Sequence, residues 1–295
     1  MLSILIPIFN FDIRPLVQRL CLLGQNLSVE WEIRCYDDGS EEDWKKKNRE
    51  IKGLGRVHYQ ELPQNLGRSR IRNLLAEEAQ GDYLLFLDCD SEVPHDAFLY
   101  RYAELLRPNT LLYGGRIYQA APPADPALYF HWLYGSKREA IPAAERRAQP
   151  YRSFMTNNFL IPTAIFLQIR FDERLLQYGH EDTLFGMQLE KKGIRIQHLD
   201  NPLIHAGLEP VGVFLSKTRQ GIQNLAFLYR SGYHIDTRLL RFYKQAERLK
   251  LTAILPWVLR VFRPIISRQL FSSKPSLRLF DLYKLSLLLD ELQRK

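Results

Sequence analysis

The sequence predicts an α/β fold with a mostly parallel central sheet, and two observations lead to this class. The first half of the chain alternates short runs rich in Leu, Ile and Val with segments whose apolar residues recur at helical spacing. Acidic residues also gather at the ends of two apolar runs, where α/β sheets commonly bind ligands. Such repeated strand–helix units pair their strands in parallel.

The elements of this first half follow one another at short intervals. The opening run LSILIPIFN is apolar and β-branched, which indicates a buried strand. Gly81 ends the helix that precedes the fourth strand. The predicted strands are 2–10, 31–40, 56–63 and 82–90, and the predicted helices between them are 13–25, 43–55 and 67–81.

The second half is less regular at first and then helical. Residues 154–169 return to buried structure, a helix runs from about Asp182 to Lys192, and 194–207 form one strand. Between them, 138–153 (REAIPAAERRAQPYRS) predicts a mobile loop that could cover a substrate. From about Val213 the pattern is mostly helical. We therefore expect one domain over residues 1–212 and a helical region over 213–295.

Composition places the chain among ordinary globular proteins, with 46% hydrophobic and 25% charged residues in 295. The three cysteines show no CxxC spacing, so we expect buried thiols in a reducing compartment. The opening apolar stretch is too short for a secretory signal, and no apolar run is long enough to span a bilayer. These features predict a cytoplasmic protein.

Positive charge is concentrated near the end of the chain. Residues 238–278 contain ten Lys and Arg and one acid, Glu247, in a chain with a net charge of +8. The basic residues alternate with large apolar ones, as in LTAILPWVLRVFRPIISRQLF. Two interpretations stay open: an amphipathic surface that lies on an anionic membrane, or a helical subdomain with a basic outer face. We expect no nucleic-acid partner, because no recognised binding motif is present.

The stretch YLLFLDCD ends an apolar strand with two carboxylates, Asp88 and Asp90. Side chains two apart on an extended chain point to the same side. Burying both carboxylates is costly unless a positive group joins them. A divalent metal ion that carries phosphate oxygens would satisfy both. The alternative is a plain loop in which one of them caps the next helix.

Five motifs occur in a fixed order: SILIPIFN, YDDGS, NLGRSRIRN, GDYLLFLDCD and GHEDTLFG. Together they resemble glycosyltransferase family two, a large inverting family with the GT-A fold, over roughly residues 2–210. Further motifs, NNFLIP, FDERL and LIHAG, are similar to the galactosyltransferase-type segment of chondroitin-synthase-like enzymes. The resemblance implies a nucleotide-sugar half at about 1–115 and an acceptor half at about 116–212.

The resemblance also implies roles for single residues. Asp38 matches the acid that holds the nucleotide base, with Asp37 beside it, although Asp-Gly is also an ordinary turn. Asp88 matches the acid near the ribose, Asp90 the metal-binding acid, and His205 an imidazole ligand of the metal.

On the acceptor side, Asp182 matches the catalytic base and Glu181 an acceptor-binding neighbour. The alternative for both is an acid favoured by the dipole at a helix N-terminus. Weaker candidates are, for the donor, Pro7, Phe9, Asn65, Gly67 and Arg68, and, for the acceptor, Trp132, Asn157, Asn158 and His180.

These parts predict a metal-dependent, inverting transfer of a sugar from a nucleotide sugar to a glycan or lipid-linked hydroxyl. We expect Mn²⁺ or Mg²⁺ as cofactor and a UDP-linked donor. Two alternatives stay open. A nucleotidyltransferase would show a glycine-rich loop after the first strand, and PIFNFDIRP has no glycine. An inactive protein that only binds nucleotide sugars would not need the full set of acids.

Overall fold

The computed structural model of the protein describes residues 1–175 and 178–293 and contains two compact units. The first unit consists of Met1–Gln119, Arg138–Leu176 and Glu181–Gly207. The second consists of Ala120–Lys137, Gln177–His180 and Leu208–Lys295. The chain therefore leaves the first unit and returns to it twice before it enters the final helical stretch.

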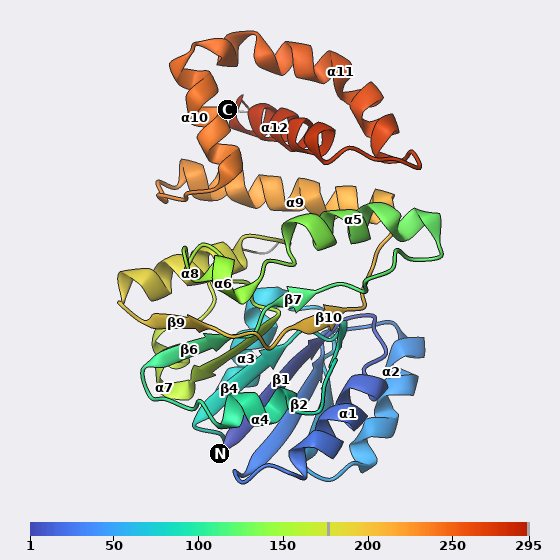
Figure 1. The fold of residues 1–295 in the computed structure, drawn as a ribbon, viewed down its shortest axis with the longest axis vertical. Coiled ribbons are helices and arrows are strands. Elements are labelled where there is room, and N and C mark those ends of the chain that lie inside the picture. Colours follow the sequence, from blue (N-terminus) through green and yellow to red (C-terminus); the bar gives the residue numbers. More distant parts are fainter. Residues whose placement is uncertain (176–177, 294–295) are drawn as a thin grey trace. The chain divides into compact units, whose positions relative to one another are not determined.

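The first unit is built on a seven-stranded sheet with the order β3-β2-β1-β4-β8-β6-β9 (Figure 1). The strands β3, β2, β1 and β4 pair in parallel, whereas β8 runs antiparallel to both of its neighbours, β4 and β6. This confirms the predicted α/β class with a mostly parallel sheet. The strands are β1 Leu2–Ile8, β2 Trp31–Asp37, β3 Val57–Glu61, β4 Tyr83–Leu87, β6 Thr110–Tyr113, β8 Asn158–Pro162 and β9 Arg195–His198.

The apolar run of β1 explains why this strand is central. Ile4, Ile6 and Ile8 point to one apolar cluster, and Leu5 points to another on the opposite face. Because side chains alternate along a strand, a run that is apolar at every position suits burial on both faces. Each of these side chains contributes roughly 1.5–3 kcal/mol by leaving water.

Helices cover both faces of the sheet. On one face α1 and α4 pack with Leu20 and Phe98, and on the other α3, α7 and α8 pack with Leu75, Phe166 and Phe185. The helices predicted over 13–25 and 67–81 are present with nearly those bounds, whereas the one predicted over 43–55 ends at Asn48 and is followed by a 3-10 helix over Arg49–Gly53. The helices of this unit are α1 Arg14–Gly24, α2 Glu42–Asn48, α3 Arg68–Glu78, α4 Phe98–Ala103, α6 Ala143–Arg146, α7 Thr163–Ile169 and α8 Glu181–Lys191.

A second, three-stranded sheet contains β5 Ser91–Glu92, β10 Leu203–His205 and β7 Arg116–Ile117 in that order. The prediction of a single strand over 194–207 is therefore wrong, because β9 and β10 belong to different sheets. The break lies at Asn201 and Pro202. Asn201 is fully buried and donates to the carbonyl of Phe98, and proline has no N–H to extend a ladder.

The segment 138–153 was expected to be a mobile loop, and this is wrong over α6. The guanidinium of Arg146 is buried and donates to the carbonyl oxygens of Ile141, Gly114 and Leu199 at 2.8–3.0 Å. It also lies 4.6 Å from the centre of the Tyr113 ring. A buried arginine without these acceptors would be very costly, so this side chain fixes the segment to the sheet.

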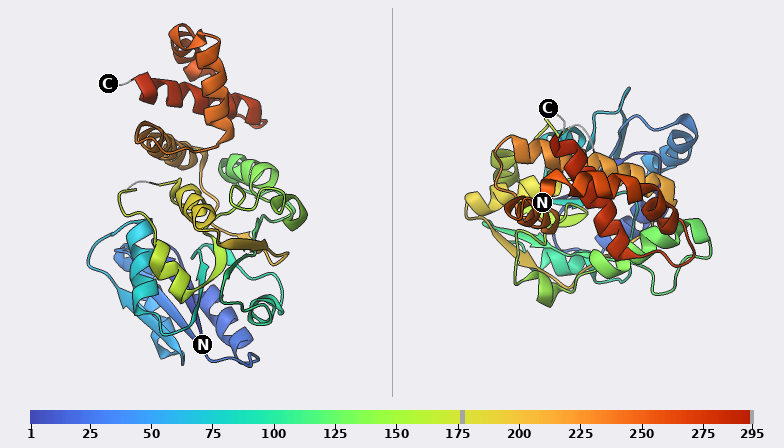
Figure 2. Two further views of the ribbon diagram at one scale, coloured as in Figure 1. Left: turned by 90° about the vertical axis from the view of Figure 1, so that its left-hand side faces the viewer. Right: turned by 90° about the horizontal axis from the view of Figure 1, so that it is seen from above.

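The second unit is helical, as the pattern after Val213 predicts. Its core includes aromatic side chains from three helices, with the Phe130 ring 5.7 Å from Phe214 and 5.2 Å from Phe280. Among the described residues no helix is long and apolar enough to cross a membrane. The helices, shown from two further sides in Figure 2, are α5 Tyr129–Arg138, α9 Val211–Arg230, α10 Arg238–Arg248, α11 Leu255–Leu270 and α12 Leu277–Gln293.

Candidate functional site

The sheet brings the predicted acids to one edge of the first unit. The parallel strands β1, β2 and β4 end at the same edge, with Asp38 directly after β2 and Asp88 directly after β4. Because β8 is antiparallel, it begins where β4 ends, and Asn158 lies opposite Leu87. This edge therefore collects residues that are up to 120 positions apart in the chain.

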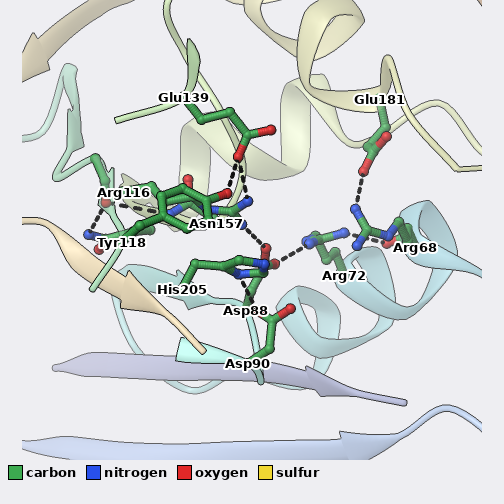
Figure 3. Close-up of polar contacts among 12 residues, drawn as sticks. Arg68, Arg72, Asp88, Asp90, Arg116, Tyr118, Glu139, Asn157, Glu181 and His205 are labelled. Carbon is green, nitrogen blue, oxygen red and sulfur yellow. Dashed lines mark hydrogen bonds and ion pairs between the residues drawn. The ribbon is translucent and has the colours of Figure 1, made fainter. Parts of the chain in front are cut away.

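Asp90 and His205 meet through the small sheet. Asp90 precedes β5 and His205 ends β10, and these strands pair with His205 opposite Ser91. The Nδ1 atom of His205 lies 3.4 Å from Oδ1 of Asp90 (Figure 3). Gly207 makes room for this acid, since a Cβ there would approach Oδ2 of Asp90 to 2.5 Å. The sheet thus brings together the two residues predicted to be metal ligands.

The Asp90–His205 pair has the properties of a partial metal site. Oδ1 of Asp90 is buried and has no hydrogen-bond partner of acceptable geometry among the described residues. Burial alone would raise the pKa of Asp90, but the imidazole of His205 and the guanidinium groups of Arg116 and Arg68 leave this pKa well below its usual range. A carboxylate with an imidazole suits Mn²⁺, and carboxylate oxygen suits Mg²⁺.

Across the part of the chain that the structure describes, no group of three or more His, Cys, Asp and Glu side chains is arranged to hold a metal ion. An ion at Asp90 and His205 would therefore take its other ligands from substrate phosphates and water. Magnesium sites in nucleotide enzymes are commonly of this kind, with one or two carboxylates plus phosphate oxygens. The two residues fit such an ion.

Asp88 is in a very different environment from Asp90. Its Oδ1 accepts from Arg72 at 2.7 Å and its Oδ2 from Arg116 at 3.2 Å. Arg72 comes from α3 and is almost fully buried, and Arg116 lies in β7. The two guanidinium groups neutralise this carboxylate inside the protein. In this structure both carboxylate oxygens of Asp88, the residue predicted to lie near the ribose, are bonded to arginines.

The network extends from Arg116 into the segment 138–153. Arg116 also donates to Glu139 at 3.3 Å, and the hydroxyl of Tyr118 donates to the same carboxylate at 2.5 Å (Figure 3). The ring of Tyr118 lies 5.3 Å from that of His205. A chain of contacts therefore links Asp88 to the imidazole that faces Asp90.

Glu181 opens α8 and is buried. Its Oε1 accepts from Arg68 at 3.0 Å, while its Oε2 is buried without a hydrogen-bond partner among the described residues. Burial would raise the pKa of Glu181, but the positive charges of Arg68 and Arg72 outweigh burial and lower it. Glu181 is therefore ionised at neutral pH and already engaged with the protein.

The next residue, Asp182, has the opposite tendency. Burial and the neighbouring negative charge of Glu181 raise its pKa to about 7, although the N–H of Thr183 donates to its Oδ1 at 2.6 Å. The residue is only half-buried. A carboxyl group with a pKa near 7 is suited to accept a proton at neutral pH.

Arg68 connects the two parts of the site. It lies at the start of α3, and its charge lowers the pKa of Asp90, Glu181 and Asp182 together. Electrostatic influence of this kind needs proximity, because it weakens with distance and with water. The predicted metal acid and the predicted base therefore share one cationic neighbour.

The two acids after β2 build the loop that precedes α3. The carboxylate of Asp38 accepts the N–H groups of Leu66 and Gly67 at 2.6 and 3.1 Å, and Asn65 donates to its carbonyl at 3.0 Å. Asp37 is fully buried and accepts the N–H of Ser40 at 2.7 Å. Burial raises the pKa of Asp38, and these N–H groups oppose that effect.

The other predicted donor residues lie near this loop. Gly67 has φ +86°, a conformation that glycine adopts at no steric cost, and it directly precedes α3. Pro7 lies near the end of β1, and Phe9 follows the strand with half of its surface exposed. An exposed aromatic ring at this edge is available to a planar ligand, and the geometry of Phe9 and Pro7 is compatible with the predicted base pocket.

The two predicted acceptor asparagines are buried within the protein. The amide of Asn158 donates to the carbonyls of Gly115 and Asn201 and accepts from Tyr102 at 2.7 Å. Asn157 is also buried. Because these groups are used inside the fold, we do not place a sugar hydroxyl on Asn158.

The remaining acceptor candidates, Trp132 and His180, belong to the second unit. Trp132 lies in α5, with its ring 5.6 Å from that of Tyr129. His180 directly precedes Glu181 in the chain and has φ +68°. Backbone at positive φ is uncommon for residues other than glycine and is often found at functional sites.

Sequence reasoning did not find the residues that surround Asp88. Arg72 lies one helical turn after Arg68 and between the apolar residues Ile71 and Leu75. Its position beside these two buried residues is the signal that could have predicted its burial. No comparable signal marks Arg116 or Glu139, since their meeting depends on the return of the chain to the first unit.

Comparisons with known proteins agree with this arrangement. The family profile described as "Glycosyl transferase family 2" matches residues 3–157, just over half of the chain. This stretch contains the acids that follow β2 and β4, namely Asp37, Asp38, Asp88 and Asp90.

Two curated relatives are similar at low identity. The chain is 23% identical over 280 residues to chondroitin synthase of Escherichia coli, covering 84% of this chain and 40% of the relative. It is 25% identical over 255 residues to hyaluronan synthase of Pasteurella multocida, covering 76% of this chain and 26% of the relative. The chain thus spans well under half the length of these two relatives.

Solved structures are similar over nearly the whole chain. Residues 1–349 of TarS from S. aureus match with a TM-score of 0.54 and 16% identity, over 99% of this chain and 88% of that one. Mannosyltransferase PcManGT from Pyrobaculum calidifontis, in complex with GDP-Man and Mn²⁺, matches with a TM-score of 0.54 and 13% identity, over 99% and 84%. At such identities the likeness shows the fold, and it confirms the expected GT-A architecture.

Proposed function

This chain belongs to glycosyltransferase family 2, and from that premise we propose an inverting transfer of a sugar from a UDP-linked donor to a hydroxyl group of a glycan or lipid-linked acceptor. Two observations support it most: Asp90 lies beside His205 as an incomplete cation site, and Asp182, whose pKa is raised to about 7, directly follows Glu181, which Arg68 contacts. Arg68 influences both groups.

The donor half would use the edge formed by β1, β2 and β4. The loop held by Asp38 and the exposed ring of Phe9 are our candidates for the nucleoside, and Gly67 places the N-terminus of α3 beside them. A helix N-terminus and Arg68 both favour the negative charge of a diphosphate. Structures of the similar protein TarS with UDP and with UDP-GlcNAc are consistent with a UDP-linked donor.

Asp90 and His205 would hold a divalent metal ion, Mn²⁺ or Mg²⁺. When bound there, the ion supplies positive charge that stabilises the departing diphosphate. The protein contributes the positions of these two ligands and the cationic groups Arg68, Arg72 and Arg116. Asp88 keeps the last two in place through its ion pairs.

Asp182 would act as the general base. An acceptor hydroxyl that attacks the anomeric carbon from the face opposite the diphosphate must lose a proton, and Asp182 would accept it. Direct displacement inverts the configuration and needs no covalent intermediate. Burial, together with the negative charge of Glu181, raises the pKa of Asp182, so its carboxylate would be a strong enough base at neutral pH.

Three residues are our candidates for contacts with the acceptor. His180 precedes Glu181 in the chain and is our first candidate for a contact that selects the acceptor, with Trp132 and Asn157 as weaker ones. The names of the two curated relatives, chondroitin synthase and hyaluronan synthase, favour a glycan acceptor. We retain the cytoplasm as the predicted compartment.

Donor binding and hydrolysis test the proposal. Purified protein is incubated with a panel of UDP-, GDP- and dTDP-sugars, with Mn²⁺, with Mg²⁺ and with a chelator. We expect metal-dependent binding of a UDP-sugar and slow release of UDP. Asp90→Asn should abolish both, whereas Asp43→Asn, at an acid on α2 whose side chain is 91% exposed, should change neither.

The same assay separates the two alternatives. A nucleotidyltransferase would release pyrophosphate from a nucleoside triphosphate and a sugar phosphate and would not hydrolyse the UDP-sugar. A protein that only binds nucleotide sugars would bind the donor with metal and yield no transfer with any acceptor. Failure of every nucleotide sugar to bind, with or without metal, would overturn the proposed function.

A further inference from the structure

The helix α11 of the second unit has two unlike faces. One face is buried and includes Leu259, Ile266 and Leu270. On this side Arg263 donates to the hydroxyl of Ser286 and to the carboxylate of Asp290, both in α12. Figure 1 shows α11 and α12 side by side within this unit. These contacts fix which face of α11 is turned away from its own unit.

The opposite face has a continuous apolar stripe. Trp257, Val261 and Ile265 recur every four residues along one side of α11, and Ile254 directly precedes the helix, three residues before Trp257. The exposed fractions of the first three are 67%, 55% and 65%, and that of Ile254 is 64%. Single exposed apolar residues are normal in soluble proteins, but a stripe of four at this spacing marks an interaction surface.

Basic residues lie at both ends of this stripe. Arg248 and Lys250 precede it, Arg268 and Lys274 follow it, and all four are exposed. Two other arginines of the helix, Arg260 and Arg263, are paired with Asp290 and contribute less to the outer charge. The surface is therefore apolar along its middle and cationic at its ends.

The length of α11 limits how it could meet a membrane. Sixteen residues at 1.5 Å each extend about 24 Å, shorter than a bilayer core of about 30 Å. A helix with an apolar stripe, Trp and flanking Lys and Arg lies in the plane of the interface, with the stripe immersed at the level of the headgroups. Trp is also enriched at this depth.

We propose that the outer face of α11, formed by Ile254, Trp257, Val261 and Ile265 with the four flanking basic residues, rests on an anionic lipid surface. The charge favours this occupant. A second copy would bring the same positive ends towards a like-charged face, and a nucleic acid would leave the apolar stripe in water. The proposal does not depend on the chemistry assigned to the first unit.

Flotation with lipid vesicles tests the proposal on the full chain. Vesicles of phosphatidylcholine alone are compared with vesicles that also contain phosphatidylglycerol, at about 0.15 M salt. We expect binding to the anionic vesicles only, weakened by added salt. Trp257→Ser with Ile265→Ser should lower the bound fraction at least about tenfold. Lys250→Gln and Lys274→Gln should each lower the partition coefficient about fivefold.

Two controls locate the contact. Leu22→Ser with Tyr100→Ser changes two residues of the first unit that are similarly exposed, at 53% and 55%, and should leave binding unchanged. Trp257→Phe should also bind vesicles, but the blue shift of tryptophan fluorescence on binding should be lost. A shift that persists in Trp257→Phe would place the contact elsewhere and overturn the assignment.

Other outcomes are equally decisive. Equal binding of Trp257→Ser/Ile265→Ser and wild type, or no flotation at all, would overturn the proposal. So would a concentration-dependent dimer, measured by light scattering, that the same double variant dissolves, or binding of nucleic acid in place of vesicles. Donor hydrolysis in solution should be the same in all of these variants, so this test and that of the first unit fail separately.

Discussion

Asp88 and Asp90 are separated by one residue, and their environments differ in almost every respect. Asp88 has each oxygen engaged by a guanidinium group, whereas Asp90 faces an imidazole at 3.4 Å and keeps one buried oxygen without a hydrogen bond. The first carboxylate is satisfied by the protein itself. The second keeps a buried oxygen to which no described residue offers a hydrogen bond of acceptable geometry.

The same contrast recurs in the next acid pair. Glu181 is paired with Arg68 and ionised, while Asp182 beside it is left with a pKa raised to about 7. In both pairs the acid that is engaged by arginine shapes the surroundings of the acid that is not. In each motif, therefore, the partners of an acid decide whether its charge is neutralised inside the fold.

The largest effect is expected at Asp90. Asp90→Asn removes the charge that a divalent ion needs, so transfer should fall by about 10³-fold or more, since a metal contributes several kcal/mol to transition-state stabilisation. Thermal stability should also fall, because His205, Arg116 and Arg68, which lower the pKa of Asp90, lose their negatively charged partner. Calorimetric titration of Mn²⁺ with UDP, beside the rate, checks this. Normal metal-dependent binding in Asp90→Asn would place the ion elsewhere.

The second effect separates the base from the donor site. Asp182→Asn should lower transfer by about 10²–10⁴-fold and leave the affinity for the donor within about twofold. The residual rate of the variant should be flat with pH, so its deficit relative to wild type should grow as the pH rises to about 7. A variant that retains more than a tenth of the wild-type rate would show that another group accepts the proton.

The third effect is a loss of stability, expected in Asp88→Asn. Asp88→Asn leaves the buried Arg72 without its carboxylate and Arg116 with Glu139 alone, which should cost about 3 kcal/mol or roughly 6–12 °C in Tm. Adding Arg72→Met should recover part of the loss, because a buried charge is then removed. The matched control is Asp96→Asn, an exposed acid paired with Arg19. Equal melting temperatures of Asp88→Asn and Asp96→Asn would contradict a supporting role.

The fourth effect is the pH dependence of Asp182. The deprotonated form is active, so kcat/KM should rise about tenfold per pH unit below pH 7 and level off above it. The stability of the fold should change in the opposite direction and fall as the pH rises. A folded pKa above the unfolded value gives stability that is present at low pH and lost as pH rises through about 7. Asp182→Asn should therefore gain stability over wild type at pH 8 relative to pH 4, measured by urea unfolding.

The smallest effect is expected at Arg68, whose side chain is 41% exposed. Arg68→Gln should cost about 1–3 kcal/mol of stability, because it leaves the buried carboxylate of Glu181 without its cation. It should also raise the pKa of Asp182 further, since a positive neighbour is lost. The control is Arg70→Gln, two residues further along α3. A shift of the pH profile to higher pH in Arg68→Gln but not in Arg70→Gln would distinguish this electrostatic role from a purely structural one.

Much of the sheet could be predicted because its signal is local. The run of β1 is apolar at every position, and Gly81 and the acids after β2 and β4 mark where elements end. Acids at strand ends could be assigned to one edge because parallel strands must end together. That part of the candidate site needed only the order of elements.

The residues around those acids could not be predicted in this way. Arg116 and Glu139 meet because the chain leaves the first unit after Gln119 and returns at Arg138, and no periodicity encodes that return. The break between β9 and β10 depends on the burial of Asn201, a tertiary effect. The burial of Asn158 is a tertiary effect as well. Its motif suggested a contact with the acceptor, but its amide is bonded within the fold.

The pairing of β6 with β8 has a consequence for how such a chain can change. Tyr113 lies opposite Phe159, so the two strands form an antiparallel hairpin whose connection is the whole stretch from 114 to 157. Lengthening a connection is cheap in loop-closure entropy, at about 0.6 kcal/mol for each doubling. Arg146, bonded to the carbonyl of Gly114, further shortens the part that must close freely. Insertions into this connection could therefore accumulate while the paired strands β6 and β8 are left intact.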